Sequence, residues 1–149
     1  MRKSFAILAS ASVLALMATA AAAQNPPPIS GQQELSVGAR VYAKSCASCH
    51  GANLEGQPNW RQRNENGRLP APPHNVRGHT WHHDDETLFG ITKLGTAEFT
   101  GLDIESDMPA FKDILSDDDI RAVLTYIKSR WSDRIRQRQD SINRRAGNR

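Results

Sequence analysis

The chain has 149 residues and a formal net charge of +3, from 19 basic and 16 acidic side chains. Residues 134 to 149 hold six arginines against the single acid Asp140, whereas residues 24 to 133 hold 11 basic and 15 acidic groups, a net charge of −4. A nucleic-acid-binding domain should carry its basic groups over a folded face. This distribution therefore argues against a nucleic-acid-binding protein.

The N-terminal segment, residues 1–23, has the pattern of a secretory signal peptide. Arg2 and Lys3 precede an apolar run that begins at Phe5, and an Ala-x-Ala site ends at Ala23. We predict cleavage after Ala23 and export to the periplasm. The alternative is an uncleaved segment that anchors the protein, because the apolar run nearly reaches the length that spans a membrane.

The remaining chain has room for one folded domain. We place a proline-rich leader at residues 24–33, the domain at 34–132 and an arginine-rich tail at 133–149. A domain this small buries a thin core and gains much from a bound cofactor. The tail has few apolar residues, so we expect it to be disordered or a short extension of the last helix. It could make a weak electrostatic contact with an acidic partner or a membrane.

The first predicted helix spans residues 34–45. Val37, Val41 and Tyr42 fall on one face at helical spacing. Gly38 costs up to about 1 kcal/mol relative to alanine in a helix interior. Its presence there predicts that another element approaches this helix closely.

The sequence Cys-Ala-Ser-Cys-His follows at residues 46–50. A thiol oxidoreductase would place Cys-x-x-Cys at a helix start in a strand–helix–strand unit, and no run before Cys46 resembles a strand. A zinc site needs four ligands but no histidine directly after the second cysteine. A c-type haem requires that histidine. We therefore predict one covalent haem c, attached through Cys46 and Cys49, with His50 as an axial ligand of the iron.

A long segment without helix or strand pattern extends from Gly51 to Trp81, with prolines at positions 58, 70, 72 and 73. Such a segment is unusual in a compact domain, but it is acceptable where a porphyrin replaces protein core. Its histidines could bind a second metal such as copper. No carboxylates stand at a spacing that would orient them, so we favour a surface turn for the cluster of His74, His79, His82 and His83.

Two further helices are predicted. The first, over residues 84–94, begins with acidic residues and is closed by Gly95. The second, over residues 116–131, begins at Ser116, with which Asp119 can form a capping box. The second helix has one apolar stripe and should pack on the Gly38 face of the first predicted helix; the stripe consists of Ile120, Val123, Leu124, Ile127 and Trp131.

Met108 is the only methionine outside the predicted signal peptide. It precedes Pro109, which favours an extended backbone and keeps Met108 out of a helix. A methionine in such a loop, in a chain that carries a haem, is a candidate for the second axial ligand. Histidine and methionine together would leave no open coordination position, which predicts one-electron exchange and not an enzyme reaction.

Residues 34–131 resemble class I cytochromes c. Gly38 and Tyr42 look like the glycine–aromatic pair of the family's N-terminal helix, and residues 123–128 look like the helix that crosses it. The sequence Asp-Met-Pro at residues 107–109 is similar to the family's distal methionine loop. The resemblance implies an all-α, cytochrome c-like fold with three to four helices wrapped around one covalent haem.

The resemblance also implies roles for two other residues. Trp81 corresponds to a tryptophan whose indole nitrogen binds a haem propionate. Pro72, with Pro70 as the alternative, corresponds to the proline whose carbonyl accepts a hydrogen bond from the ligand histidine. The chain departs from the family in an insertion over residues 56–68, near the haem edge, and in His74, which stands where the family usually has leucine packed on the porphyrin.

The function that these features imply is that of an exported, monomeric electron carrier. It would accept and donate single electrons between exported or membrane redox proteins that the sequence does not name. Two alternatives stay open. One is a haem subunit of, or an electron donor or acceptor to, a periplasmic dehydrogenase or oxidase. The other is a haem protein with an additional copper-binding histidine cluster.

Overall fold

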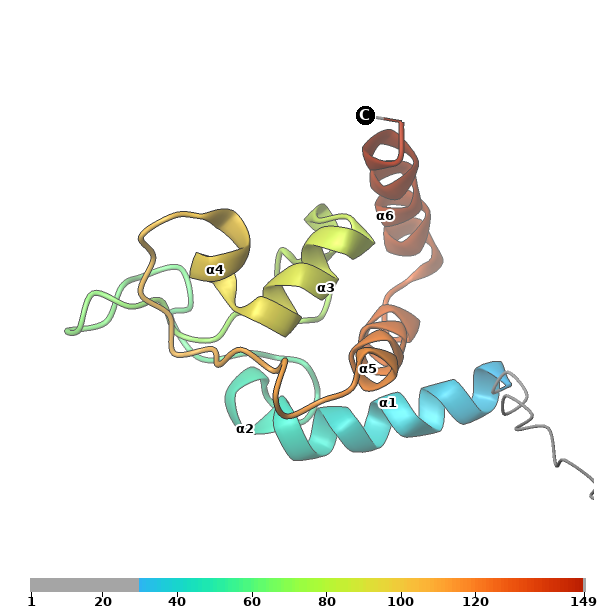
Figure 1. The fold of residues 1–149 in the computed structure, drawn as a ribbon, viewed down its shortest axis with the longest axis horizontal. Helices are drawn as coiled ribbons and strands as arrows, with labels where there is room; N and C mark the ends of the chain where they lie inside the picture. Colours follow the sequence, from blue (N-terminus) through green and yellow to red (C-terminus); the bar gives the residue numbers. More distant parts are fainter. Residues whose placement is uncertain (1–29, 149) are drawn as a thin grey trace, which may run out of the picture.

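The structure is a computed structural model that describes residues 30–148, so the predicted signal peptide and most of the proline-rich leader lie outside the described residues. Over the described range the secondary structure is helical and contains no strand, which confirms the all-α fold class. No helix among these residues has the length and apolar character needed to span a bilayer. The elements follow one another as α1 (Gly31–Ser45), α2 (Ala47–His50), the 3-10 helix η1 (Thr80–His82), α3 (Asp85–Leu94), α4 (Thr96–Thr100), α5 (Asp117–Ser129) and α6 (Asp133–Ala146) (Figure 1).

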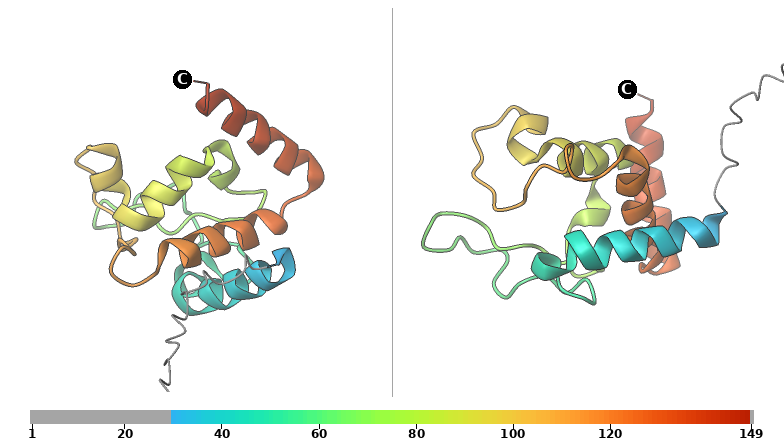
Figure 2. Two further views of the ribbon diagram at one scale, coloured as in Figure 1. Left: turned by 45° about the vertical axis from the view of Figure 1, so that its right-hand side comes forward. Right: turned by 60° about the horizontal axis from the view of Figure 1, so that its bottom comes forward.

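The helices α1 and α5 cross closely, as Figures 1 and 2 show. Gly38 is buried at the crossing, and a Cβ atom on it would overlap the backbone carbonyl of Ala122 and lie 2.8 Å from the Cβ of Tyr126. A larger residue would therefore push the two helices apart. The predicted close approach at Gly38 is confirmed, and the helix that approaches is α5, as predicted.

The ends of α3 and α5 follow their capping signals. Ser116 and Asp119 form the predicted capping box at the start of α5, where the Oγ of Ser116 accepts from the Asp119 N–H at 3.1 Å. Asp84 caps α3 by accepting from the Thr87 N–H at 2.9 Å, and Gly95 ends α3 with a φ of 82°. Non-glycine residues rarely adopt such a φ, which explains why the helix stops at Gly95.

The buried core lies between α1 and α5 and extends to Ile135 near the start of α6. Its members are Tyr42, Leu54, Val123, Ile127, Trp131 and Ile135. The predicted apolar stripe of α5 supplies much of this core, and Ile120 of the same stripe is fully buried. Leu88 and Phe111 are buried outside this cluster, whereas other large apolar side chains are exposed, among them Leu69, Phe99, Leu102, Ile104 and Ile114. The domain therefore combines a packed core with apolar side chains that protein packing leaves uncovered.

The tail was expected to be disordered or a short extension of the last helix, and in the structure Asp133–Ala146 form a separate helix, α6, that packs on the rest of the domain. Ile135 joins the core, and Gln139 is 0% exposed. The Nε2 of Gln139 donates to the carboxylate of Asp85 at 2.7 Å, and the Oδ1 of Asn143 accepts from the Asp85 N–H at 2.8 Å. The helix thus docks mainly through polar side chains that complete the start of α3, and apolar content could not reveal this.

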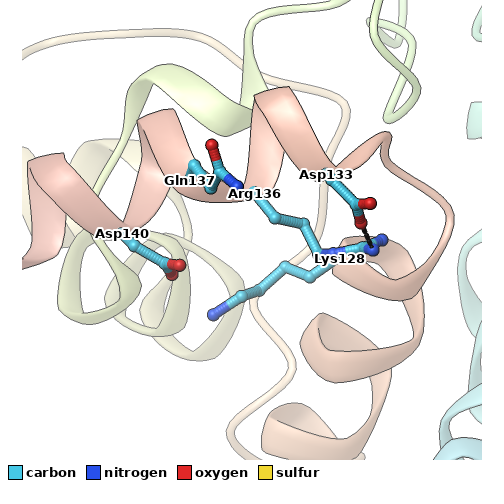
Figure 3. Close-up of a pocket in the computed structure, with 5 residues that line it drawn as sticks. All are labelled: Lys128, Asp133, Arg136, Gln137 and Asp140. Atoms are coloured by element: carbon cyan, nitrogen blue, oxygen red, sulfur yellow. Dashed lines mark hydrogen bonds and ion pairs between the residues drawn. The ribbon is translucent and has the colours of Figure 1, made fainter.

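A charged corner joins α5 to α6. Lys128 extends from α5 below α6 and pairs with Asp85 at 2.8 Å, while Arg136 pairs with Asp133 (Figure 3). A pocket at this corner is lined by Lys128, Asp133, Arg136, Gln137 and Asp140. The Lys128 pair links α5 to the start of α3, and the Arg136 pair lies within the first turn of α6.

Candidate haem site

A single turn carries both cysteines and the adjacent histidine. The helix α1 ends where the Cys46 N–H donates to the carbonyl of Tyr42 at 2.9 Å, and α2 then begins with the His50 N–H donating to the carbonyl of Cys46 at 2.9 Å. Cys46 is half-buried, Cys49 is exposed and His50 is buried at 7% exposure. Burial, followed by the neighbouring Cys49, raises the pKa of the Cys46 thiol to about 11.

His50 is held in one tautomer by a backbone carbonyl. Its Nδ1 lies 2.8 Å from the carbonyl oxygen of Pro72, and because a carbonyl can only accept, Nδ1 carries the proton and donates. The Nε2 lone pair is then free to bind a metal. Burial lowers the pKa of His50, against an opposing effect of the Pro72 hydrogen bond. The ring is therefore kept in the neutral form that coordinates iron.

Tyr42 fixes the backbone that follows the histidine. Its hydroxyl donates to the carbonyl of Gly51 at 2.9 Å and lies 3.4 Å from the carbonyl oxygen of His50. Gly51 has a φ of 81°, which turns the chain out of α2. Burial raises the pKa of Tyr42, so the hydroxyl remains a donor over the ordinary pH range.

His74 stacks on His50, with ring centroids 3.8 Å apart and planes at 19°. Its backbone is fixed on both sides: the indole N–H of Trp131 donates to the carbonyl of His74 at 2.8 Å, and the His74 N–H donates to the carbonyl of Leu54 at 3.0 Å. Burial, then His50 and His79, lowers the pKa of His74 to about 3. Its Nδ1 is buried without a hydrogen-bond partner among the described residues. A neutral, flat ring thus lies against His50 at the position where the family has leucine.

The four histidines of the predicted cluster do not converge on one point. His74 contacts His50, His82 stacks on Trp81 at 3.7 Å, and His79 lies 5.6 Å from the ring of Trp60 and 5.4 Å from that of His83. Within residues 30–148, no group of three or more metal-binding side chains is arranged to hold an ion. The geometry therefore gives no support to an additional copper site.

Trp81 has a buried indole nitrogen without a partner among the described residues. The ring packs against the core, and the guanidinium of Arg138 on α6 lies 5.2 Å from its centroid. A buried N–H without an acceptor costs free energy. A carboxylate at this position, such as a haem propionate, would satisfy it.

Met108 lies half-buried in the loop between α4 and α5. Its N–H donates to the Oγ of Ser106 at 3.1 Å. The neighbouring Asp107 pairs with Arg68 at 2.6 Å, so the Met108 loop and the insertion over residues 56–68 lie side by side. The sequence gives no sign of this contact of Arg68, because a pairing of residues 39 positions apart, on two irregular loops, leaves no periodic pattern.

These residues fit a large, flat, apolar group that carries carboxylates. His50 offers a free Nε2, Trp81 has a buried donor without an acceptor, and the loops nearby expose apolar side chains such as Leu69 at 50% and Leu102 at 58%. A large apolar ligand that covered these side chains would remove their surface from water. The fold and the site together define a small helical protein of the c-type haem class.

A sequence model of the family described as "Cytochrome c" matches residues 35–131, so the chain belongs to the cytochrome c family. Searches of curated proteins and of solved structures found no match. The cofactor is one covalently bound haem c, and the spacing of Cys46 and Cys49 fits its attachment. Members of this family serve in haem-based electron transfer.

Proposed function

We propose that this protein is a one-electron carrier in which His50 and Met108 are the two axial ligands of the haem iron. The observation that carries the proposal is the hydrogen bond from His50 Nδ1 to Pro72, because it leaves the Nε2 of a neutral imidazole with a free lone pair that can bind a metal. When bound, the haem supplies a centre that changes oxidation state by one electron.

The chain's own residues would hold this centre and set its properties. Cys46 and Cys49 would form the thioether bonds, and the buried nitrogen of Trp81 would donate to a propionate. Met108 would bind through its thioether sulfur, which favours ferrous iron and raises the reduction potential relative to a second histidine. With both axial positions filled, neither oxygen nor peroxide finds an open site, so the proposed role is not enzymatic.

The cellular setting is part of the proposal. The signal pattern of residues 1–23 supports export to the periplasm with cleavage after Ala23, and an uncleaved anchor is the alternative. The partners would be redox proteins, with the domain acting as a monomer. The exposed arginines of α6 support a weak contact with an acidic partner or an anionic membrane: Arg134, Arg138, Arg144 and Arg145. The mass of the mature protein from a periplasmic extract tests the cleavage site.

The axial assignment is tested on the purified protein by absorption spectroscopy. We expect the oxidised protein to show the weak near-infrared band of an iron–thioether bond, and Met108→Ala to abolish it. Met108→His should lower the reduction potential, because imidazole replaces the thioether. A haem enzyme or gas sensor with an open sixth position would instead give the same spectrum for the Met108→Ala variant and the natural protein, and this result would rule out the proposed ligation.

A further inference from the structure

Arg68 is the side chain that links the loop carrying Met108 to a segment distant in sequence. For residues 102–109, the hydrogen bonds and ion pairs to other parts of residues 30–148 are those of Arg68 and the local bond from the Leu102 N–H to the Oγ1 of Thr100 at 3.3 Å. The Nε of Arg68 lies 3.3 Å from Glu105 Oε2, and its second guanidinium nitrogen lies 2.6 Å from Asp107 Oδ1. After the loop, the chain is fixed again where the Phe111 N–H donates to the carbonyl of Thr92 at 3.1 Å.

Arg68 is itself held at the base of a tight turn. Its N–H donates to the Oδ1 of Asn64 at 3.0 Å, and the Asn64 N–H donates to the carbonyl of Arg68 at 2.8 Å. Arg63 donates to the carbonyl of Gly67 at 2.6 Å, which closes the same turn. The backbone of Arg68 is therefore fixed by hydrogen bonds that do not involve the carboxylates. Less conformational entropy is lost in forming the two ion pairs than from a flexible backbone.

We propose that Arg68 is a positioning residue for the sixth ligand of the haem iron. By pairing with the carboxylates on both sides of Ser106, it holds the loop so that Met108 stays near the iron. The inference rests on the proposed ligation by Met108. Arg68 makes no bond to the iron or to the methionine, and it acts only through the loop.

The size of the effect follows from the exposure of the pairs. The side chains of Arg68, Glu105 and Asp107 are 38%, 69% and 59% exposed, so water and salt screen each pair and each contributes modestly. Two such pairs on one guanidinium should shift the balance between the bound and the displaced methionine about fivefold. A small ligand that needs the displaced state binds in proportion to the population of that state.

The test is a titration of the oxidised holoprotein with imidazole, followed by loss of the near-infrared iron–thioether band. Arg68→Gln removes the charge and should raise the apparent imidazole affinity about fivefold at low salt. Added salt should raise the affinity of the natural protein towards that of the variant, whose own affinity should change little. Glu105→Gln and Asp107→Asn should have almost no effect when added to Arg68→Gln, because their partner is already absent.

The matched control is Arg61→Gln, which removes the same charge from the same insertion. The guanidinium of Arg61 lies 4.4 Å from the centroid of Trp60 and forms no ion pair with the Met108 loop. An equal rise in imidazole affinity for Arg61→Gln and Arg68→Gln would overturn the proposal, and so would an unchanged affinity for Arg68→Gln. Absence of the near-infrared band from the natural protein would instead overturn the ligation by Met108 itself, so the two failures are distinguishable.

Discussion

His74 combines a favourable ring contact with an unfavourable buried nitrogen. Its ring stacks on His50 at 3.8 Å, while its Nδ1 is shielded from water without a hydrogen-bond partner in the described part of the chain. A buried polar atom without a partner costs about 1 to 3 kcal/mol. Because Trp131 and Leu54 fix the backbone of His74 by hydrogen bonds, an apolar side chain of similar size could take the same place.

We therefore expect His74→Leu to stabilise the holoprotein by about 1 to 2 kcal/mol, because leucine keeps the apolar contact and removes the orphaned nitrogen. The measurement is the free energy of unfolding in denaturant, with both proteins carrying haem. His82→Leu is the control, since His82 is exposed and stacks on Trp81 instead of His50. A loss of stability in His74→Leu would show that the stacked imidazole contributes more than its buried nitrogen costs.

The crossing of α1 and α5 places a strict limit on side-chain size. We expect Gly38→Ala to destabilise the protein by about 3 kcal/mol or more, because its Cβ would overlap the carbonyl of Ala122 and the backbones would have to separate. Gly31→Ala is the control within the same helix, since nothing lies within 4 Å of its added Cβ. That variant should be unchanged or more stable by up to about 1 kcal/mol, as measured by thermal or denaturant unfolding.

The docking of α6 depends on a buried amide. Gln139→Ala should cost about 1 to 3 kcal/mol, because it leaves Asp85 without one of its donors and removes a fully buried side chain. Gln137→Ala, on the exposed side of α6, should change the free energy of unfolding by less than about 0.5 kcal/mol. Equal effects of the two substitutions would contradict the observed packing of α6.

Sequence patterns predicted the elements whose signals are local. The capping box at Ser116, the apolar stripe of α5 and the need for a close neighbour at Gly38 are each written within a few residues, and all are present. The place of α6 could not be predicted in this way. Its contacts join Gln139 and Asn143 to Asp85 through polar groups more than fifty residues apart, which no periodicity reports.

The candidate site likewise contains residues that have a local sequence signal and contacts that have none. The Cys-x-x-Cys-His motif and the loop before Pro109 are local signals, so the sequence indicated the cysteines, His50 and Met108 as candidates. The hydrogen bond from His50 to Pro72 was expected from the family resemblance and is present at 2.8 Å. The pairing of Arg68 with the Met108 loop depends on how two irregular segments fold together, and composition carries no signal for it.

At the scale of the whole molecule, the described domain has one side packed by protein and another that exposes apolar side chains. The first side is the core formed by residues of α1, α5 and α6, and the second includes Phe99 of α4 with Leu102 and Ile104 of the Met108 loop. Because protein packing leaves these apolar side chains uncovered, the two sides should differ in how often they open. Proteins commonly open in such cooperative units, with free energies from near zero up to that of global unfolding.

Amide hydrogen exchange on the holoprotein can measure this difference. We expect the amides of Tyr42, Val123 and Ile127 to exchange only through global unfolding, because their side chains are at most 3% exposed in the α1–α5–α6 core. Amides of residues 102–108 should exchange at least about a hundred times faster than these, a difference of about 3 kcal/mol in opening free energy. Met108→Ala should accelerate exchange in that loop. In the same variant, the opening free energy of the slow amides of α1 and α5 should still equal the free energy of global unfolding. Uniform protection across both sides would mean that the domain opens as one unit, and the Met108 loop could not then behave as a separate part of it.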